Sequence, residues 1–362
     1  MISSLYIHIP FCDRICNYCD FCKVLKGTFS EELYIKALIK EIDSLNIKKN
    51  SLKTIYIGGG TPTALSDNLF KELLSYLNKR FYHPKEFTVE ANPESLTKKK
   101  VSLMLRYGVN RVSLGVQSSN DERLRFLGRN HQAKDVIKAV GLLRKNMLLN
   151  YNLDFIYGVP GMQKSDVVKD VNFAIMLKPT HLSFYSLQIE DGTVFKNNKI
   201  EAESDLKMSE TYNLIRGLLS KRGYHRYEVS NFALKGYESI HNLNYWHDGM
   251  YYAAGVSASG YMGNIRYTNT RSIYNYCKGI NHQIINKIEP KDKEFEFLML
   301  NLRLQKGFKL TDFYSRFNKN FLTSYKDQIA KVKDDVLIDS KSFKIKPNKI
   351  YIMDAILLDL LK

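Results

Sequence analysis

The chain has 362 residues, of which 44% are hydrophobic and 25% charged, and its formal net charge is +17 at pH 7. This composition is typical of a folded globular protein and argues against a disordered or fibrous chain. No apolar run approaches the ~20 residues of a transmembrane helix, which excludes such a span, and the length predicts two or three domains.

The positive charge is compatible with a nucleic acid, an anionic membrane surface or a ligand with several carboxylates. The basic residues form no single stripe, and runs such as Lys98–Lys100 resemble solvated helix faces. We find no charged leader followed by an apolar core and a cleavage site. We therefore expect a cytoplasmic protein, whose thiols stay reduced and available to metals.

The first predicted strand, Leu5–Pro10, leads directly into a loop that carries Cys12, Cys16 and Cys19. The C-x3-C-x2-C spacing allows three thiolates to bind three corners of a 4Fe–4S cube and leaves its fourth iron without a protein ligand. S-adenosylmethionine is the usual occupant of such an iron, through its amino and carboxylate groups. Reduction of its sulfonium yields methionine and a 5′-deoxyadenosyl radical, so the loop predicts radical chemistry.

Two other interpretations of the cysteines remain open at this point. A structural zinc ion could use four thiolates, although zinc modules usually take their second ligand pair from farther along the chain. A disulfide framework needs an oxidising compartment and an even count, whereas this chain has five cysteines. The residues concerned are Cys12, Cys16, Cys19 and Cys22, with Cys277 alone and expected to be a buried small hydrophobe.

Short β-branched or aromatic runs alternate with segments that have apolar residues at helical spacing. The predicted strands are Leu5–Pro10, Thr54–Gly58, Glu86–Asn92, Arg111–Gln117, Tyr151–Gly158 and His181–Ile189. The predicted helices between them are Glu31–Leu45, Ser66–Asn78, Thr97–Arg106, Ala133–Arg144 and Ser165–Leu177. Six β-α repeats imply parallel strands with right-handed crossovers, in an open doubly wound sheet or a partial barrel.

In either arrangement the active face lies at the carboxyl ends of the strands. The cysteine loop follows the first strand, Gly58–Pro62 follows the second and Glu90–Pro93 the third. Gln117 ends the fourth strand, and Asp154 lies near the end of the fifth. This regular placement predicts one site that is fed by successive strands.

Several of these residues have both a functional and a structural interpretation. Gly58–Pro62 is a tight turn whose bare backbone can approach a ligand, and it does not match the G-x-G-x-x-G pattern of a dinucleotide fold. Glu90 would be costly to bury unless an amino group of the cofactor or an internal cation pairs with it. Arg129 could make a forked contact to the cofactor carboxylate, and Asp154 could accept from ribose hydroxyls. As lone residues, Arg129 and Asp154 would be structural.

After the α/β repeats the pattern changes. We predict a helix at Leu206–Ser220, a tyrosine-rich, hairpin-like region at Tyr224–Tyr267, and a helix at Asp292–Leu304. The end, Lys309–Lys362, reads as two helices, a short hairpin and a final helix, which is a winged-helix-like composition. The predicted divisions are 1–225, 226–290 and 291–362. Winged helices often serve as structural modules, so DNA binding is not favoured.

The segment His241–Trp246 contains the chain's single tryptophan. A histidine beside Tyr and Trp is usually a hydrogen-bonded packing residue. The alternative is an axial ligand to haem, with the aromatic rings forming part of a flat apolar slot.

Motifs over nearly the whole chain resemble the radical SAM coproporphyrinogen III oxidase-like family, and within it the HemW-type haem chaperone branch. They are Leu5–Cys12, Gly58–Pro62, Val89–Pro93, Gly115–Ser118, Asp154–Pro160, Tyr227–Ala233 and His241–Trp246. The resemblance implies an α/β fold: a partial (β/α)6 radical SAM barrel followed by a smaller α+β C-terminal region that ends in a winged-helix-like module.

By motif position, the resemblance implies that Cys12, Cys16 and Cys19 hold a 4Fe–4S cluster. It places eight residues around S-adenosylmethionine: Tyr6, Gly59, Gly60, Thr61, Glu90, Gln117, Arg129 and Asp154. The family's H-N-x-x-Y-W motif, proposed for haem binding, matches this chain and would place His241 beside haem.

The resemblance also implies a function. A HemW-type protein binds haem and passes it to acceptor haem proteins such as membrane-bound respiratory enzymes, a role that involves dimerisation and membrane association. The alternative is an enzyme of the same fold that oxidatively decarboxylates the propionates of coproporphyrinogen III. Radical modification of RNA is disfavoured, because the chain has no evident RNA-binding module.

Two departures from the family pattern bear on this choice. The coproporphyrinogen-oxidising branch typically reads C-x3-C-x2-C-x-C, whereas here Phe21 takes the last position and Cys22 comes one residue late. This weakens the decarboxylase interpretation. Ser259 stands where relatives have a histidine, which removes a second haem-side ligand.

Overall fold

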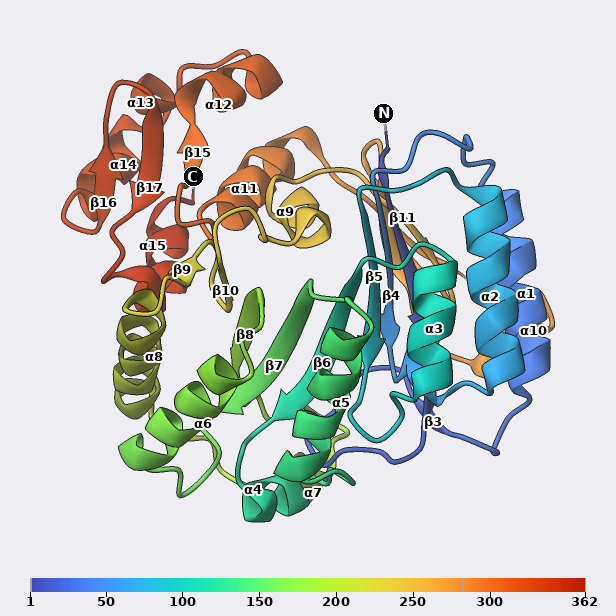
Figure 1. The fold of residues 1–362 in the computed structure, drawn as a ribbon. Coiled ribbons are helices and arrows are strands. Elements are labelled where there is room, and N and C mark those ends of the chain that lie inside the picture. The colour runs from blue at the N-terminus through green and yellow to red at the C-terminus, as the bar shows by residue number, and fades with distance from the viewer. Residues whose placement is uncertain (1, 282, 362) are drawn as a thin grey trace.

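The computed structural model describes residues 2–281 and 283–361, which form a partial barrel with a smaller region beside it (Figure 1). The barrel is one nine-stranded sheet with the order β11-β1-β4-β5-β6-β7-β8-β10-β9. Its six central strands are parallel: β1 (Ser4–Ile9), β4 (Thr54–Gly59), β5 (Glu86–Ala91), β6 (Arg111–Gln117), β7 (Tyr151–Tyr157) and β8 (His181–Ser186). The predicted α/β partial barrel is confirmed, and the sixth strand ends earlier than expected.

Helices join these strands and cover the outer face of the sheet (Figure 1). They are α1 (Glu31–Ser44), α2 (Asp67–Arg80), α3 (Lys98–Arg106), α4 (Asp121–Phe126), α5 (Ala133–Lys145) and α6 (Lys164–Met176). Their starts follow local chemistry, because the side chains of Ser30, Ser66 and Thr97 cap the first turns of α1, α2 and α3.

Alternation along the strands separates an apolar outside from a polar inside. On β4, Ile55 and Ile57 belong to the apolar core between sheet and helices. On the same strand, the side chain of Thr54 bonds to an interior histidine and that of Tyr56 to Glu90. The interior of the barrel is therefore lined by groups that can bind polar ligands.

The segment after β8 completes both edges of the sheet. β11 (Tyr252–Ala254) pairs parallel to β1, while β10 (Asn231–Ala233) and β9 (His225–Arg226) extend the β8 edge antiparallel. The predicted hairpin in this region is present as β12 (Ser259–Met262) and β13 (Ile265–Thr268), which pair with β14 (Ile284–Lys287). The domain boundaries at 225 and 290 stay a prediction.

The remaining helices and strands lie in the connections of the barrel, after β8 and in the C-terminal region, which is drawn in orange and red beside α8 (Figure 1). They are β2 (Phe11–Cys12), β3 (Val24–Leu25), η1 (Pro62–Ala64), α7 (Val194–Asn197), α8 (Asp205–Ser220), α9 (Ile240–Trp246), α10 (Ile273–Cys277), α11 (Pro290–Asn301), β15 (Phe308–Lys309), α12 (Leu310–Phe317), α13 (Phe321–Ser324), α14 (Lys326–Val332), β16 (Val336–Ile338), β17 (Ser342–Ile345), η2 (Ile350–Ile352) and α15 (Met353–Asp359). Three short helices replace the two expected before the hairpin, because Asn318, with φ 52°, ends α12 in the left-handed conformation. Lys362 lies outside the described residues.

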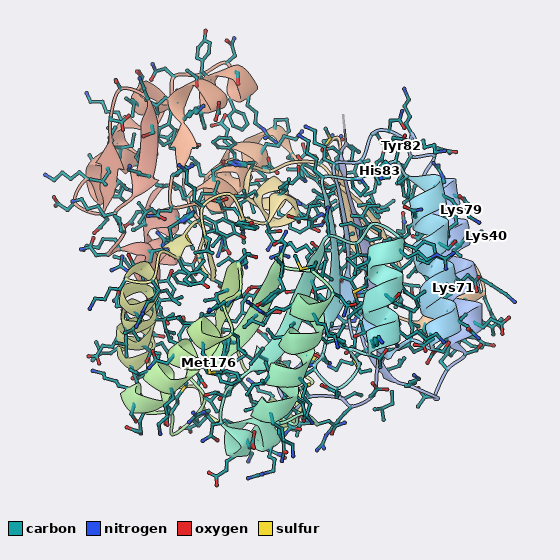
Figure 2. All side chains as sticks on the ribbon, in the orientation of Figure 1. Lys40, Lys71, Lys79, Tyr82, His83 and Met176 are labelled. Atoms are coloured by element: carbon teal, nitrogen blue, oxygen red, sulfur yellow. The ribbon has the colours of Figure 1, made fainter. Side chains whose placement is uncertain are left out.

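None of the helices formed by the described residues is long and apolar enough to cross a membrane. Lys40 on α1 and Lys71 and Lys79 on α2 lie on the outer side of the helical layer, where their charge is solvated (Figure 2). The expectation of a solvated face is wrong for Lys100, which is buried and donates to the carbonyl oxygens of Thr63 and Leu65. Three lysines in a row give no sign that the third turns inward.

Candidate functional site

A cavity of about 450 Å³ lies at the carboxyl ends of β4 to β8, beneath the cysteine loop. Its lining brings together ten of the predicted site residues: Cys12, Cys16, Cys19, Gly59, Gly60, Thr61, Glu90, Gln117, Arg129 and Asp154. Tyr6 and His241 do not contribute to this lining. The predicted cluster ligands and most of the predicted cofactor residues thus face one space.

The cysteine loop is held on both sides by backbone hydrogen bonds. β2 and β3 pair in parallel at its base, where Lys26 N–H donates to the Cys12 carbonyl at 2.8 Å. At its tip, Asn17 N–H donates to the Leu127 carbonyl at 3.0 Å. The side-chain amide of Asn17 also donates to the Phe126 carbonyl, at 2.8 Å. These contacts fix the loop against the barrel before any metal binds.

The three thiols lie in surroundings suited to thiolates that bind iron. Burial raises the pKa of Cys12 to about 12, and a hydrogen bond from Thr61 Oγ1 at 3.8 Å offsets part of that shift. Burial likewise raises the pKa of Cys19, against the nearby charge of Lys23. Arg129 Nη1 donates to Cys16 Sγ at 3.3 Å. Donors to sulfur stabilise a ligating thiolate, while burial keeps the Cys12 and Cys19 thiols protonated in the absence of metal.

Within the described residues, no three or more His, Cys, Asp or Glu side chains are arranged around a point that could hold a single metal ion. A zinc site needs its ligands to converge in this way, whereas a cluster takes each thiolate on a different iron. Cys22 does not line the cavity, and its Sγ donates to the Arg271 carbonyl at 3.5 Å. Three thiols that line the cavity, with the fourth bonded outside it, fit the three protein ligands of a cluster that has an open iron.

The glycine turn after β4 lets the backbone pass close to the loop and to Glu90. Gly59 has φ +116°, a conformation that favours glycine. A Cβ on Gly60 would lie 2.9 Å from Cys12 Sγ, and one on Gly58 would lie 2.8 Å from the Glu90 carboxyl carbon. Side chains at these positions would therefore collide with the cysteine loop and with Glu90.

Glu90 presents a carboxyl group whose two oxygens are both bound by the protein. Tyr56 Oη donates to Oε1 at 2.7 Å, and Gly59 N–H donates to Oε2 at 3.1 Å. Burial raises the Glu90 pKa to about 7, and the Tyr56 hydrogen bond works in the opposite direction. The group is thus poised to ionise when a cationic or hydrogen-bonding ligand arrives.

Arg129 links the cysteine loop to the end of β5. Its Nη2 donates to Asn92 Oδ1 at 2.5 Å and to the Gly115 carbonyl at 3.1 Å, while Asn92 Nδ2 donates to Thr61 Oγ1 at 2.9 Å. Its Nε is buried and has no hydrogen-bond partner among the described residues. A buried guanidinium with a free N–H suits an anionic ligand such as a carboxylate.

Gln117 and Asp154 reach the cavity from neighbouring strands. A register shift between Gly115 and Gln117 interrupts the pairing of β6 with β7, and Gln117 takes φ +66°. Such a bulge turns the side chain into the cavity. Asp154 accepts from Ser113 Oγ at 2.9 Å and from Asn152 Nδ2 at 2.7 Å, and burial raises its pKa.

His241 lies at the other end of the barrel, on α9, which Figure 1 shows across the amino ends of the strands. The side chain is fully buried, and both ring nitrogens are bonded within the protein. Nδ1 contacts Thr54 Oγ1 at 2.8 Å and Nε2 contacts Tyr245 Oη at 2.7 Å. This is the arrangement expected of a packing histidine, and haem ligation by His241 stays a prediction that requires one of these bonds to be exchanged.

The cavity also contains residues that the sequence did not single out. Asn92 connects Arg129 to Thr61, Tyr56 holds Glu90, and Tyr185 lines the wall beside Asp154. The sequence did carry a signal for these residues. By alternation along their strands, Tyr56 and Tyr185 face the barrel interior, and Asn92 follows β5 directly. In isolation, however, a tyrosine in a strand is indistinguishable from core packing.

Two family models match the chain. The Radical SAM superfamily model matches residues 6–174, which include the cysteine loop and most of the cavity, and the HemN C-terminal domain model matches residues 288–345. Among solved structures, the Escherichia coli coproporphyrinogen III oxidase HemN, described as a radical SAM enzyme, superposes with a TM-score of 0.86. That likeness covers 100% of this chain and 90% of the other at 20% identity, so it shows the fold alone.

The curated relatives are more similar in sequence. The heme chaperone HemW of Lactococcus lactis is 39% identical over 348 residues, which is 93% of this chain and 90% of that protein. The HemW proteins of Bacillus subtilis and Escherichia coli are 35% and 37% identical, with 88% and 83% of this chain covered and 88% and 82% of theirs. Identity at this level over nearly the full length assigns the family: the chain belongs to the HemW family of radical SAM proteins.

Proposed function

We propose that this chain is a radical SAM-type haem chaperone, which binds a 4Fe–4S cluster, S-adenosylmethionine and haem and delivers haem to acceptor haem proteins. The observation that carries the cofactor part is the convergence of three cysteines and the predicted cofactor residues on one cavity. The haem part rests on the relatives, which are named heme chaperones.

In this proposal the residues have distinct tasks. Cys12, Cys16 and Cys19 would hold three irons and leave the fourth open for the cofactor. When bound, the cluster supplies an electron to the cofactor sulfonium. Glu90 would accept from the cofactor amino group, and the free Nε–H of Arg129 would donate to its carboxylate.

The remaining cofactor residues would fix the rest of the molecule. Asp154 would accept from ribose hydroxyls, and Gln117 would donate or accept at the cavity wall. Gly59, Gly60 and Thr61 would offer backbone groups where side chains have no room. Tyr6, which lies outside the cavity lining, would act only through its neighbours.

His241 is the proposed haem-side residue, and the acceptors would be haem proteins such as membrane-bound respiratory enzymes. A cytoplasmic carrier that dimerises and meets the membrane surface would suit this task. Nucleic acid is not expected as a partner.

Haem titration into the anaerobically reconstituted protein tests the proposal, with the Soret band as readout. We expect saturable binding that His241→Ala weakens. The matched control is His247→Ala, which removes an exposed histidine next to the same helix and should leave binding unchanged. Absence of saturable binding by the wild type would remove the chaperone assignment, whereas equal binding by His241→Ala would move the haem site elsewhere.

The same preparation separates carrier from enzyme. Coproporphyrinogen III, incubated anaerobically with S-adenosylmethionine and a reductant, should be recovered unchanged. Formation of a vinyl-bearing product would establish oxidative decarboxylation of the propionates instead.

A further inference from the structure

A row of aromatic side chains crosses the barrel interior between the cysteine loop and α9. The rings of Tyr6 on β1 and Tyr56 on β4 are stacked, with centroids 6.2 Å apart and planes at 30°. The ring of Tyr56 faces that of His241 at 5.1 Å and 31°, and His241 meets Tyr245 edge-on at 4.9 Å. The row connects the two ends of the barrel without a break.

At the carboxyl end the row is bonded to the cysteine loop. His8 Nε2 lies 2.8 Å from the Cys22 carbonyl and its Nδ1 lies 3.0 Å from Tyr6 Oη. Because a carbonyl can only accept, Nε2 carries the proton of the neutral ring, and Nδ1 accepts from the Tyr6 hydroxyl. Burial lowers the His8 pKa, which keeps this ring neutral.

At the amino end the row is fixed to α9. The two ring bonds of His241, to Thr54 and Tyr245, leave its imidazole one orientation, and its backbone N–H donates to Glu86 Oε1 at 3.1 Å. Burial lowers the His241 pKa to about 3, so the ring that faces Tyr56 is neutral. A fixed, uncharged ring is a rigid support for the Tyr56 ring that packs against it.

Between these ends, Tyr56 is the member of the row that touches the candidate cofactor site. Its ring packs against the rings of both His241 and Tyr6, and its hydroxyl donates to Glu90 Oε1 at 2.7 Å. Two ring contacts restrict the orientation of Tyr56 and so fix the position of its hydroxyl. A fixed hydroxyl in turn holds the Glu90 carboxylate in one place for a ligand.

We propose that His241 and Tyr56 are positioning residues for the cofactor, with the His241 ring holding Tyr56 and the Tyr56 hydroxyl holding Glu90 toward the cofactor amino group. The inference rests on the S-adenosylmethionine site of the proposed function and needs no haem. It gives the H-N-x-x-Y-W histidine a role at the opposite end of the barrel from its own helix.

The proposal has a pH signature. Glu90 faces titratable and charged groups from six elements: Tyr6 on β1, Tyr56 on β4, Arg111 on β6, Asp154 on β7, Tyr185 on β8 and Tyr245 on α9. Burial raises its pKa and the Tyr56 bond lowers it. Loss of the Tyr56 hydroxyl therefore raises the Glu90 pKa, so the ionised form that the cofactor needs is reached at a higher pH.

The test is the dissociation constant of S-adenosylmethionine, measured from pH 5.5 to 8.5 on the anaerobically reconstituted full chain. Tyr56→Phe keeps the ring and should weaken binding about tenfold at pH 7, the loss expected for one hydrogen bond to a charged group. The pH at which affinity reaches half its plateau should rise. His241→Ala should shift both quantities in the same direction, and His241→Phe, which restores a ring against Tyr56, should recover part of the affinity.

The control is Tyr224→Phe, which removes another buried hydroxyl, one bonded to the Pro179 carbonyl at 2.6 Å, and should leave both quantities unchanged. Unchanged affinity and pH midpoint in Tyr56→Phe and His241→Ala, beside a wild type that binds the cofactor, would overturn this inference alone. A wild type that holds its cluster but binds no S-adenosylmethionine would overturn the cofactor part of the proposed function, and this inference with it. Tyr56→Phe removes one hydroxyl and opens no cavity, so this variant should fold. Its affinity and pH midpoint therefore test the inference even if His241→Ala does not fold.

Discussion

The cavity under the cysteine loop and the junction of α9 with the barrel are built from similar buried polar side chains. In the cavity an N–H that is unpartnered within the described part of the chain lies beside open volume, whereas both oxygens of Glu86 and both ring nitrogens of His241 at the α9 junction are bonded within the protein. At the α9 junction, Glu86 accepts from Ser239 Oγ and from the backbone N–H groups of residues 240 and 241, and both nitrogens of His241 are bonded. In the cavity, Arg129 Nε has no partner among the described residues, and the pKa of Glu90 is raised. A buried polar group without a hydrogen-bond partner beside open volume, more than polarity itself, distinguishes the candidate ligand site from the α9 junction.

The largest effect is expected from a substitution in the cysteine loop over the cavity. Cys16→Ser should abolish the broad iron–sulfur absorbance of the reconstituted protein, because the thiolate that Arg129 contacts is lost. The fold should stay intact by far-UV circular dichroism, since the loop is anchored by backbone bonds. Cys22→Ser is the matched control and should keep the cluster. Loss of absorbance in that variant would show that Cys22 is a ligand.

Weakening the hydrogen bonds that hold α9 to the barrel should lower the stability of the protein and leave the cluster unaffected. Glu86→Gln places an amide group against three donors that Glu86 now satisfies, and should lower the free energy of unfolding by about 3 kcal/mol. Urea unfolding followed by circular dichroism measures this loss. Glu72→Gln, at an exposed position of α2, should change it by less than about 0.5 kcal/mol. A Glu86→Gln protein as stable as the wild type would mean that other contacts hold α9.

The raised pKa of Glu90 should also make the stability of the protein depend on pH. The folded pKa of Glu90, about 7, lies above its ordinary value of 4.5, so the folded state binds more protons between these values. Wild-type stability should therefore fall as pH rises from 4.5 through about 7, and Glu90→Gln should remove that fall. Relative to the wild type, the variant should gain about 2 kcal/mol between pH 5 and pH 8 in the absence of cofactor. Parallel pH profiles of the two proteins would contradict the raised pKa.

The smallest effect is expected at the tryptophan of the H-N-x-x-Y-W motif. Trp246 Nε1 is buried without a hydrogen-bond partner among the described residues, and the ring lies 5.8 Å from the Arg303 guanidinium carbon. Trp246→Phe keeps an aromatic face toward Arg303 and should cost less than about 1 kcal/mol in urea unfolding. A larger loss, or loss of haem binding in this variant alone, would give the indole a role of its own.

Much of the barrel was predictable because local and periodic signals agree there. Apolar runs such as Arg111–Gln117 and serine caps such as Ser30 mark strands and helices within a few residues of their observed ends. The cysteine spacing likewise pointed to one loop, which the structure places over the cavity. These signals lie within short windows of sequence, so they need no knowledge of the rest of the fold.

The features that sequence could not supply depend on contacts between distant segments. β11 has three residues and no pattern of its own, and its pairing with β1 becomes evident only in the folded sheet. Lys100 turns inward because its ammonium group donates to backbone carbonyls that follow β4. Tyr56 contributes to the site because it contacts His241 and Glu90, which lie on other elements. The haem role of His241 stays a prediction for the same reason, since its motif does not reveal which bonds the folded protein has already made.

The pairing of β11 with β1 has a consequence for how this chain is made. The first strand leaves the ribosome with the cysteine loop attached, but Tyr252, its partner on the outer edge, follows much later. At a synthesis rate of roughly 5–20 residues per second, that edge stays unpaired for roughly 10–50 s. An open strand edge can pair with other chains during that time. We therefore expect nascent chains to need protection until residues 252–254 emerge, and the cysteine loop to be synthesised well before the sheet beside it is complete.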